Sequence, residues 1–451
     1  GAGTGGVPAG VRRPKGSHAI VIIEWKCRTA MTIGLMCVAG AVTAQTPQHL
    51  ALHDAEQRAL ANHPRVRAAQ YSAEASEEAV KETRSAYFPA VSASMTGAEA
   101  ESGSRIAAGG LNNPIILDRF AGGVSFGEML TDFGRTRALV QSASLHADAM
   151  QQGVTNQRAD ILLQLDRAYF NSLRAQAVEN VAQETVTARQ LVVDQVTAEA
   201  ASGLKSGLDL SFAHVNLSQA QILLVQARND LESAFTALSA ALGSSDYVTY
   251  DLVDEPLPAE PPPDGAALVA QALRDRPDVA TGKLSQRAAL KFADAQNLLW
   301  LPSISLVGAF GVAPYRQVGL NSRYSAIGVN LTLPVTTGGL NMARRAEAAF
   351  AANSEEQRLH DLENAVARDV RTAWLDAQAS FRRLDLAREL QSHAADAMDL
   401  AQTRYDNGLG SIVELTQAQL NKTQADIEAA TARYDCQIRT AALNYQIGAL
   451  K

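Results

Sequence analysis

The chain has 451 residues, a formal net charge of −7 and only 5 % aromatic residues. This length usually corresponds to two or more domains. A net negative charge disfavours a polyanionic partner, so we expect no nucleic-acid binding. The abundance of Ala, Gln, Leu and Glu favours long, exposed helices over a large globular core.

The first segment, residues 1–45, is predicted to be an N-terminal extension followed by a signal peptide. A mostly apolar run from Ala30 to Ala44 comes after a basic residue and ends in small side chains before Gln45. This pattern is typical of a secretory signal, and the run is too short for a membrane-spanning helix. The alternative is a buried N-terminal helix. With the signal removed, Cys436 is the remaining cysteine, so we expect no intrachain disulfide.

The rest of the chain repeats itself. Residues 59–64 (ALANHP) match residues 272–277 (ALRDRP). From Gly123 onward, about 120 residues align without a gap at an offset of 205 residues, and this offset superposes Gly203 on Gly408. The sequence therefore predicts a tandem duplication of one structural unit.

The duplication divides the mature chain into three parts. We predict a first repeat over 46–243, a Pro-rich linker over 244–265 and a second repeat over 266–451. The linker contains the stretch DEPLPAEPPPDG, in which the proline content rules out a regular helix.

Each repeat has two segments in which apolar residues alternate with small or polar residues. These segments cover about 89–97 and 119–131 in the first repeat, and about 302–313 and 324–335 in the second. A period of two predicts β-strands with one apolar face. Strands of this length can cross a bilayer when they are tilted. The alternative is a pair of soluble hairpins that bury one face.

Long helices are predicted after the second strand of each repeat. Residues 135–202 contain no proline and a single glycine, and residues 340–406 form a segment of much the same length. Such a helix measures about 100 Å. Shorter helices are predicted over 208–242 and about 278–299. Apolar and small residues spaced alternately by four and three positions predict coiled-coil packing of the long helices.

Four strands per chain cannot close a β-barrel, for which about eight strands are the practical minimum. An open sheet edge cannot face lipid. If the strands enter a membrane, several chains must pool them around one axis, and the helices would form a hollow extension of the barrel. The predicted fold class is therefore mixed α and β, with four membrane strands and long coiled-coil helices in each chain.

The strand-to-helix junctions resemble those of a known protein family. They read LTDFGRTRA (130–138) and LPVTTGGLNMA (333–343). Together with the signal peptide, the duplication and the two Gly-Leu pairs, they make the chain resemble the TolC-like outer membrane efflux protein family (outer membrane factor) over about residues 50–451. The resemblance implies a homotrimer with a 12-stranded β-barrel, continued by an α-helical periplasmic tunnel with the linker in an equatorial belt.

The same resemblance implies a function and a location. Channels of this kind lie in the outer membrane of a Gram-negative bacterium and export small molecules or polypeptides passively, within a tripartite efflux or type I secretion system. The implied partners are a periplasmic adaptor (membrane fusion protein), an inner-membrane pump and outer-membrane lipid. Two alternatives remain: a soluble periplasmic coiled-coil adaptor and a pump-independent outer membrane porin. The cargo is not predicted.

The two breaks between helices are predicted to be hairpin tips. Glycine tolerates the left-handed conformation that ends a helix, which explains Gly203 and Gly408. By resemblance, the tips dock the adaptor. The predicted docking residues are Gly203, Leu204, Gly408 and Leu409.

Each break is followed by a Ser-x-x-acid pattern, which predicts a helix cap. Ser206 precedes Asp209, and Ser411 precedes Glu414. In a capping box the serine oxygen accepts a backbone N–H and the acid reaches back to another. We expect the cleaner box at Glu414, because the usual box has Glu or Gln in that place. Capping alone is one sufficient explanation of both acids.

Gating is the other explanation, and it comes from the resemblance. Asp209 occupies a position that pairs with the tyrosine matched here by Tyr405. Glu414 and Gln417 occupy the positions of acids that constrict the tunnel, although Gln417 departs from the pattern because it is neutral. A gate with fewer charged interactions would either be looser or be held closed by other contacts, such as those of Asp406. The predicted periplasmic gate residues are Asp209, Tyr405, Asp406, Glu414 and Gln417.

No motif predicts an enzyme. The sequence has no evident Ser/His/Asp or Cys/His arrangement, and no phosphate-binding glycine loop precedes a lysine. His49 and His53 are one helix turn apart but have no third metal ligand nearby. We therefore expect no catalytic residue, no metal and no cofactor, so that the energy for export must come from a partner.

Overall fold

The structure is a computed structural model that describes residues 48–99, 119–316 and 321–450. The predicted signal peptide lies outside these residues. The described residues belong to one unit, Gln45–Lys451. Long helices and two small β-sheets make up this unit, so the fold is of the mixed α and β class.

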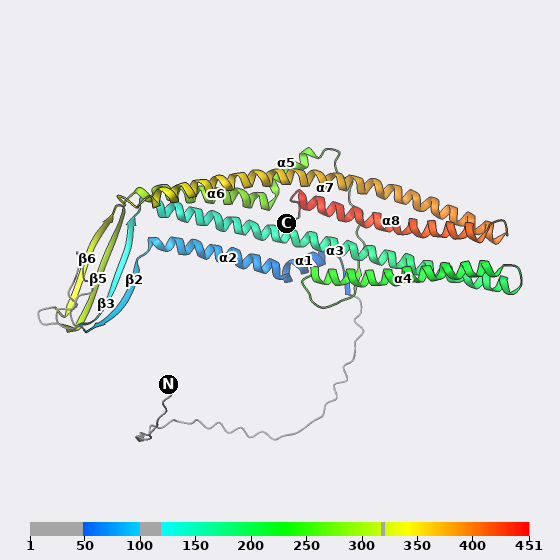
Figure 1. Cartoon of the computed structure of the whole chain (residues 1–451), viewed down its shortest axis with the longest axis horizontal. Helices are drawn as coiled ribbons and strands as arrows, with labels where there is room; N and C mark the ends of the chain where they lie inside the picture. The colour runs from blue at the N-terminus through cyan, green and yellow to red at the C-terminus, as the bar shows by residue number, and fades with distance from the viewer. Residues whose placement is uncertain (1–47, 100–118, 317–320, 451) are drawn as a thin grey trace, which may run out of the picture. The chain divides into compact units, whose positions relative to one another are not determined.

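Two helical hairpins dominate the unit (Figure 1). The first pairs α3 (Arg135–Ala201) with α4 (Gly207–Ala241), and the second pairs α7 (Leu340–Asp406) with α8 (Ile412–Gln446). α3 and α7 each have 67 residues, about 100 Å of helix, while α4 and α8 each have 35. The hairpins lie side by side because α3 also packs against α8. None of the described helices is both long and apolar enough to span a membrane.

Four shorter helices precede the strands of the two repeats. They are α1 (Leu52–Asn62), α2 (Pro64–Arg84), α5 (Ala266–Asp275) and α6 (Pro277–Asn297), with single 3-10 turns at Ser85–Tyr87 (η1) and Leu298–Trp300 (η2). α2 and α6 both begin with proline, which suits the first turn because its missing N–H would have no helical partner there. Both pack against α3. The sequence analysis predicted α6 but did not identify α2.

The strands form a four-stranded antiparallel sheet. Its members are β2 (Ala90–Ala98), β3 (Arg119–Thr131), β5 (Ser303–Arg316) and β6 (Arg323–Thr332), in the order β2-β3-β5-β6. β6 ends at Thr332, short of the expected residue 335, because Pro334 cannot donate a ladder hydrogen bond. β2 and β6 are the two edges of the sheet.

The two faces of this sheet differ in chemistry. One row of directly opposed residues places Val91, Phe126 and Ile327 on the same face, all apolar. The next row lies on the other face and brings the hydroxyl oxygens of Ser92 and Ser125 within 2.8 Å. Val91 and Ile327 of the apolar face are exposed in the single chain, and Phe126 between them is half-buried. We call the second face the serine face.

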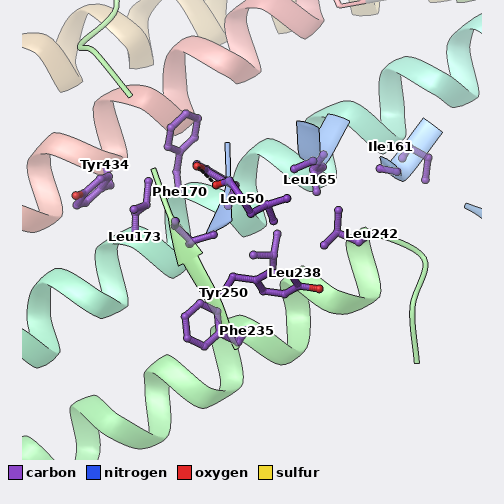
Figure 2. Packing of buried hydrophobic residues seen from close by; sticks show 14 of the residues in the cluster. Leu50, Ile161, Leu165, Phe170, Leu173, Phe235, Leu238, Leu242, Tyr250 and Tyr434 are labelled. Atoms are coloured by element: carbon purple, nitrogen blue, oxygen red, sulfur yellow. Dashed lines mark hydrogen bonds between the residues drawn. The ribbon is translucent and has the colours of Figure 1, made fainter. Parts of the chain in front are cut away.

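A second, two-stranded sheet joins distant parts of the chain. β1 (Gln48–Leu50) and β4 (Tyr250–Leu252) pair in parallel. The Tyr169 hydroxyl on α3 lies 3.0 Å from the carbonyl oxygen of Leu50 in β1 and 2.7 Å from that of Val253, the residue after β4. These strands rest on a core of side chains from α3, α4 and α8 (Figure 2). The sequence analysis did not predict this pairing.

The linker is held by the residue that matches Tyr169 in the second repeat. This residue is Trp374, whose indole N–H donates to the carbonyl oxygen of Pro262 at 2.8 Å. Residues 253–262 contain no helix or strand, as the proline content predicts. The two repeats thus use the same position on their long helices to bind the linker, Tyr169 at Val253 and Trp374 at Pro262.

The short helix of each hairpin, α4 or α8, ends in close contact with the junction between two other helices, α1–α2 or α5–α6. A side chain at Gly243, after α4, would lie 3.0 Å from the Cα of His63, and one at Gly448, after α8, would lie 3.0 Å from the carbonyl carbon of Asp275. Both glycines also have positive φ, +80° and +75°. Only glycine meets both demands without strain.

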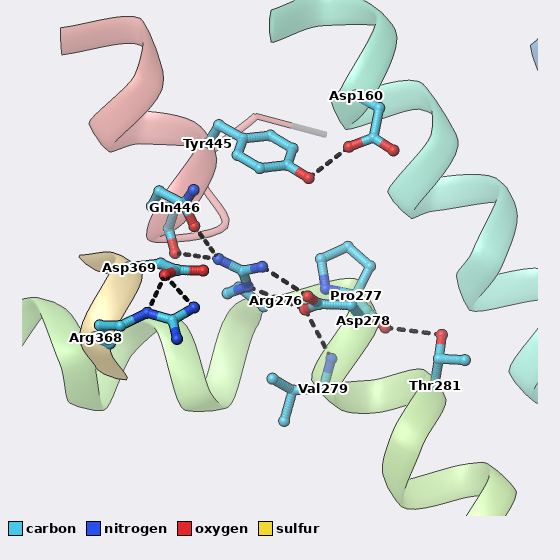
Figure 3. A network of polar contacts seen from close by, with 10 residues as sticks. All are labelled: Asp160, Arg276, Pro277, Asp278, Val279, Thr281, Arg368, Asp369, Tyr445 and Gln446. Atoms are coloured by element: carbon cyan, nitrogen blue, oxygen red, sulfur yellow. Dashed lines mark hydrogen bonds and ion pairs between the residues drawn. The ribbon is translucent and has the colours of Figure 1, made fainter. Parts of the chain in front are cut away.

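A polar network fixes the second of these junctions (Figure 3). The buried Arg276 guanidinium donates to both carboxylate oxygens of Asp278, at 3.0 and 2.6 Å, and to the backbone carbonyl of Gln446 at 3.2 Å. The Tyr445 hydroxyl next to it donates to Asp160 of α3 at 2.5 Å. The C-terminal end of α8 is therefore tied to both α6 and α3.

Candidate functional site at the hairpin tips

The tip between α3 and α4 begins with a left-handed glycine. Gly203 has a φ of +75°, and its N–H donates to the carbonyl oxygen of Ala200 at 3.0 Å. The Leu204 N–H donates to the carbonyl oxygen of Glu199 at 2.9 Å. These two bonds satisfy carbonyl groups that the end of the helix leaves without partners.

The tip between α7 and α8 repeats this geometry. Gly408 has a φ of +71° and donates to Tyr405 at 3.0 Å, while Leu409 donates to Arg404 at 2.8 Å. The side chains of Leu204 and Leu409 are 76 % and 72 % exposed, so each tip presents one large apolar side chain to its surroundings.

A complete capping box starts α4. Ser206 Oγ accepts from the Asp209 N–H at 3.2 Å, and Asp209 Oδ2 accepts from the Ser206 N–H at 3.0 Å and from its hydroxyl at 2.8 Å. These hydrogen bonds favour the ionised form and lower the pKa of the Asp209 carboxyl below its ordinary value. The carboxylate is exposed at the tip, so it caps the helix and presents charge at the same time.

The start of α8 differs, and the expectation of a cleaner box at Glu414 is wrong. Ser411 Oγ accepts from the Glu414 N–H at 3.1 Å, but the Glu414 carboxylate accepts from Arg404 Nε at 3.0 Å instead of returning to the serine N–H. The longer glutamate reaches across the turn to an arginine in the last turn of α7. In the first repeat the matching position is Glu199, which would repel Asp209.

Tyr405 lies behind the tips in a small core that both hairpins build. It is 3 % exposed and packs with Val196, Ile412 and Leu415. The Lys205 ammonium of the other tip lies 4.0 Å from the centroid of its ring, a cation–π contact. The phenol oxygen is buried and makes no hydrogen bond with the described residues, and burial raises the pKa of Tyr405. Within one chain Asp209 and Tyr405 therefore form no hydrogen bond, and the pairing that the resemblance implies stays a prediction.

Asp406 and Gln417 make local contacts. Asp406 accepts from Gln402 at 2.9 Å, and Gln417 donates to Asn421 at 2.9 Å. Each partner is four residues away on the same helix. Within the described chain, neither side chain forms a hydrogen bond that joins the two hairpins.

Residues outside the predicted set join the hairpins near the tips. Asn216 donates to the Thr416 hydroxyl at 2.9 Å. Lys205 and Arg404 were also missed by the sequence analysis, although Arg404 precedes an acid by ten residues across a glycine turn, a spacing that brings the two side chains together. The other contacts join residues that only the tertiary fold brings close, so no local signal identifies them.

A buried arginine lies between the hairpins. Arg189 is 4 % exposed, and it forms no ion pair or hydrogen bond with any described residue. Burial lowers the pKa of its guanidinium to about 10. It borders a cavity of about 310 Å³ formed by α3, α7 and α8.

The two histidines considered as metal ligands have other partners. His49 Nδ1 lies 3.2 Å from Asp251, and His53 Nε2 lies 2.8 Å from Gln57. Within the described ranges, no group of three or more His, Cys, Asp or Glu side chains is arranged to hold a metal ion.

Comparison with known proteins accounts for this architecture. The sequence matches the family described as "Outer membrane efflux protein" twice, over residues 55–244 and 268–449. The chain belongs to this family. It is 25 % identical over 375 residues to "Outer membrane protein OprJ" of Pseudomonas aeruginosa, covering 80 % of this chain and 76 % of OprJ. It is 24 % identical over 413 residues to "Outer membrane protein TolC" of Escherichia coli, covering 87 % and 81 %.

Solved structures of outer membrane channels share the fold. The CmeC outer membrane channel of Campylobacter jejuni superposes with a TM-score of 0.77 at 18 % identity, over 88 % of this chain and 85 % of CmeC. The outer membrane protein VceC of Vibrio cholerae gives 0.73 at 17 % identity, over 88 % and 96 %. This efflux protein is therefore an outer membrane protein of a Gram-negative bacterium with a role in transport, and its TolC-type relatives are channels, not enzymes.

Proposed function

We propose that three copies of this chain form a channel-tunnel, which passively exports small molecules or polypeptides for a tripartite efflux or type I secretion system. One observation carries the proposal. A four-stranded sheet with two unpaired edges is joined to helical hairpins about 100 Å long, and the sheet cannot be complete within one chain.

The sheet supports a shared barrel. Its apolar face is exposed, as a lipid-facing surface would be, and the opposite face carries serine and glycine. Edges β2 and β6 have unpaired backbone groups, which lipid does not tolerate. Pairing β2 of one copy with β6 of the next removes every edge, and three copies give 12 strands around a water-filled interior.

The helices support the same assembly. Contacts within the unit give the lateral order α4-α3-α8-α7, so α4 and α7 are the outer helices. One face of α4 exposes apolar residues at coiled-coil spacing, which suits packing against a helix of a neighbouring copy. These residues are Leu208, Phe212, Val215, Ile222 and Val225.

The tips supply the gate and the docking site in this proposal. Asp209, Tyr405, Asp406, Glu414 and Gln417 would surround the periplasmic opening of the tunnel, and the exposed Leu204 and Leu409 would contact the periplasmic adaptor. The adaptor connects the channel to an inner-membrane pump, which supplies the energy. The three-part organisation, 46–243, 244–265 and 266–451, belongs to the proposal. The second family match, 268–449, lies within the second predicted repeat, and the first, 55–244, ends one residue beyond the first predicted repeat.

Cysteine crosslinking across the open edges tests the assembly. One cysteine replaces Ser92 on β2, and a second replaces one residue of β6 in a panel from Tyr324 to Asn330, because the register between copies is unknown. In the oxidised outer membrane we expect one register to give a covalent trimer on a denaturing gel. The matched control moves the second cysteine to Ala309 of the central β5, where no neighbouring edge lies.

A monomer that stays in the periplasmic fraction would favour the soluble adaptor instead, and the crosslinks would then be absent from every register. A trimer that admits solutes freely without any pump would favour the porin. Long helices would have no role in a porin, so we prefer the channel-tunnel.

Conductance tests the gate. Asp209→Ala combined with Tyr405→Phe should raise the single-channel conductance in planar bilayers, since both changes remove groups from the proposed constriction. Tyr71→Phe, at a 68 % exposed tyrosine of α2, is the control. If the double variant conducts like the control and antibiotic sensitivity is unaltered, Asp209 is a helix cap only.

A further inference from the structure

One tyrosine stands out among the small side chains of the serine face. Its row in the ladder lies two residues along β3 from Ser125 and consists of Ser94, Gly123, Gly311 and Tyr324. Because successive side chains of a strand point to opposite faces, a row two residues away lies on the same face as Ser125. Among the described residues of the four strands, Tyr324 is the only aromatic residue on the serine face.

Two glycines make room for the tyrosine ring. A Cβ atom at Gly311 would lie 2.5 Å from Tyr324 Cζ, and a Cβ atom at Gly123 would lie 3.0 Å from it. Both would overlap the Tyr324 hydroxyl oxygen. Gly311 is on β5, next to β6, and Gly123 is on β3, one strand farther. The side chain of Tyr324 therefore extends across the neighbouring strand and lies along the sheet instead of pointing away from it.

The other face of this ring is free. Tyr324 is 43 % exposed, as expected for a ring with one face on the two glycines and the other open. Its hydroxyl forms no hydrogen bond with any described residue, so the ring is positioned by its packing on glycine. A ring with one open face can stack with other planar aromatic groups.

The direction that the ring faces depends on the proposed function, on which this inference rests. If the apolar face contacts lipid, the serine face lines the interior of the barrel, and Tyr324 faces the export path. The side chain extends from β6 toward β5, away from the open edge, so pairing with a neighbouring copy would leave the ring face free. We propose that the Tyr324 rings of the trimer bind planar aromatic solutes by stacking as these solutes pass through the barrel.

The surroundings of the ring determine what it selects. Its neighbours on the serine face are Ser94, the two glycines and Ala326, which offer little apolar contact. A planar solute would therefore gain more from the ring than a saturated solute of similar size. Stacking tolerates many different planar groups, because each has a π face. A weak contact of this kind suits a channel, which must release what it binds.

Fluorine NMR tests whether the ring binds such a solute. The full mature protein is labelled with fluorotyrosine and studied in detergent, and the resonance missing from Tyr324→Phe is assigned to Tyr324. Adenosine, which carries a planar base, should shift this resonance saturably. Ribose, the matched probe without the base, should leave it unshifted. No shift with adenosine, or an equal shift with ribose, overturns the proposal.

Conductance tests whether the ring lies in the export path. Adenosine added on the side of the strand ends remote from the helices should reduce the single-channel current in the wild type and in Tyr324→Phe, which keeps the ring. Tyr324→Leu keeps an apolar side chain without a ring, and it should need at least about fivefold more adenosine for the same reduction. The matched control, Phe310→Leu, removes an exposed ring from the apolar face and should behave like the wild type.

Equal sensitivity to adenosine in Tyr324→Leu and Tyr324→Phe overturns the proposal, and so does a loss of sensitivity in Phe310→Leu. The glycines are not used as test positions, because a Cβ at Gly311 would also lie 2.5 Å from the carbonyl oxygen of Gly122 and disturb the sheet itself. The NMR measurement does not need Tyr324→Leu, so it decides the question even if that variant fails to fold.

The two measurements separate this inference from the proposed function. NMR in detergent does not depend on conductance, so a saturable shift in a protein that forms no channel would retain the binding site and reject the proposed function. A conducting trimer whose Tyr324 resonance does not respond to adenosine would retain the proposed function and reject the binding site.

Discussion

The tip between α3 and α4 and the tip between α7 and α8 have the same backbone hydrogen bonds but different side-chain contacts. Both end a helix with a glycine at positive φ and start the next with serine. In the first tip the acid, Asp209, returns to its own serine, whereas in the second Glu414 binds Arg404. The two repeats thus share the glycine that ends one helix and the serine that starts the next, whereas the contacts of their charged side chains differ.

The side chains that differ between the two tips allow the first tip to pack against the second. Tyr405 stands where the first repeat has Ala200, and it receives Lys205, which stands where the second repeat has Gly410. A side chain at Gly410 would lie 3.2 Å from the backbone nitrogen of Tyr405, so glycine keeps this place free. One bulky ring and one missing side chain let two similar turns fit together.

Removing the ring should give the largest effect on this arrangement. Tyr405→Ala deletes a buried side chain, and we expect the local stability of the tips to fall by about 3 kcal/mol. Hydrogen exchange of the amides in the first turn of α8 measures the change. Tyr405→Phe should be neutral or stabilising in one chain, because the hydroxyl it removes is buried and has no hydrogen-bond partner among the described residues.

A loss of stability in Tyr405→Phe would contradict this expectation. It would mean that the hydroxyl finds its partner in a neighbouring copy, which would support the gate over simple packing. Tyr71→Ala serves as the control, since this tyrosine is largely exposed.

The hairpins also differ at a buried position farther from the tips. Arg189 of the first hairpin matches Ala394 of the second, which is buried as well. A buried charge without a partner is destabilising, so Arg189→Met should raise the free energy of unfolding by about 1–4 kcal/mol. Thermal melting in detergent measures the change. Arg228→Met, at an arginine that pairs with Glu179, should leave stability the same or slightly lower.

A lower melting temperature in Arg189→Met would contradict this prediction. It would mean that Arg189 has a stabilising partner in the assembled protein that it does not have among the described residues of one chain.

Removing each serine cap tests whether the caps stabilise the two tips equally. Ser206→Ala and Ser411→Ala each remove a cap, with an expected cost of about 1 kcal/mol. The first should cost more, because Ser206 Oγ also donates to Asp209 at 2.8 Å. Exchange rates of the first-turn amides of α4 and α8 give the comparison. Equal costs would mean that the hydroxyl bond to Asp209 contributes nothing.

Sequence alone predicted the hairpins well and their contacts poorly. The bounds of α7 and β3 agree with the expected 340–406 and 119–131, because glycine, proline and alternating residues mark element ends locally. The pairing of β1 with β4 and the contact of Lys205 with Tyr405 join segments about 200 residues apart, which no local pattern encodes. The capping box was predicted at both tips but is complete at only one, since Arg404 competes for Glu414.

Low pH should increase the difference in stability between the two tips. Hydrogen bonds from Ser206 lower the pKa of Asp209 in the folded chain. A lowered pKa means that the cap stabilises the fold above the unfolded value, about 3.9, and that this contribution is lost as the pH falls through the folded pKa. Amide exchange at the start of α4, corrected for its intrinsic rate, should therefore quicken below about pH 4. Asp209→Asn should remove this dependence, and an unchanged profile in that variant would assign it to another group.

The ion pair of the second tip should give the smallest effect. Arg404 and Glu414 are about half exposed, and their atoms lie 3.0 Å apart. Exposed pairs contribute about 0.2–1 kcal/mol and weaken with salt. A double-mutant cycle with Arg404→Gln and Glu414→Gln, measured at low and high salt by exchange in α8, gives the coupling. Because Arg404 also donates to the Leu409 carbonyl at 3.2 Å, Arg404→Gln alone should cost more than Glu414→Gln. Equal costs, with no coupling at low salt, would mean that the second tip is closed by its backbone and Tyr405 alone, and that its charges are available to other chains.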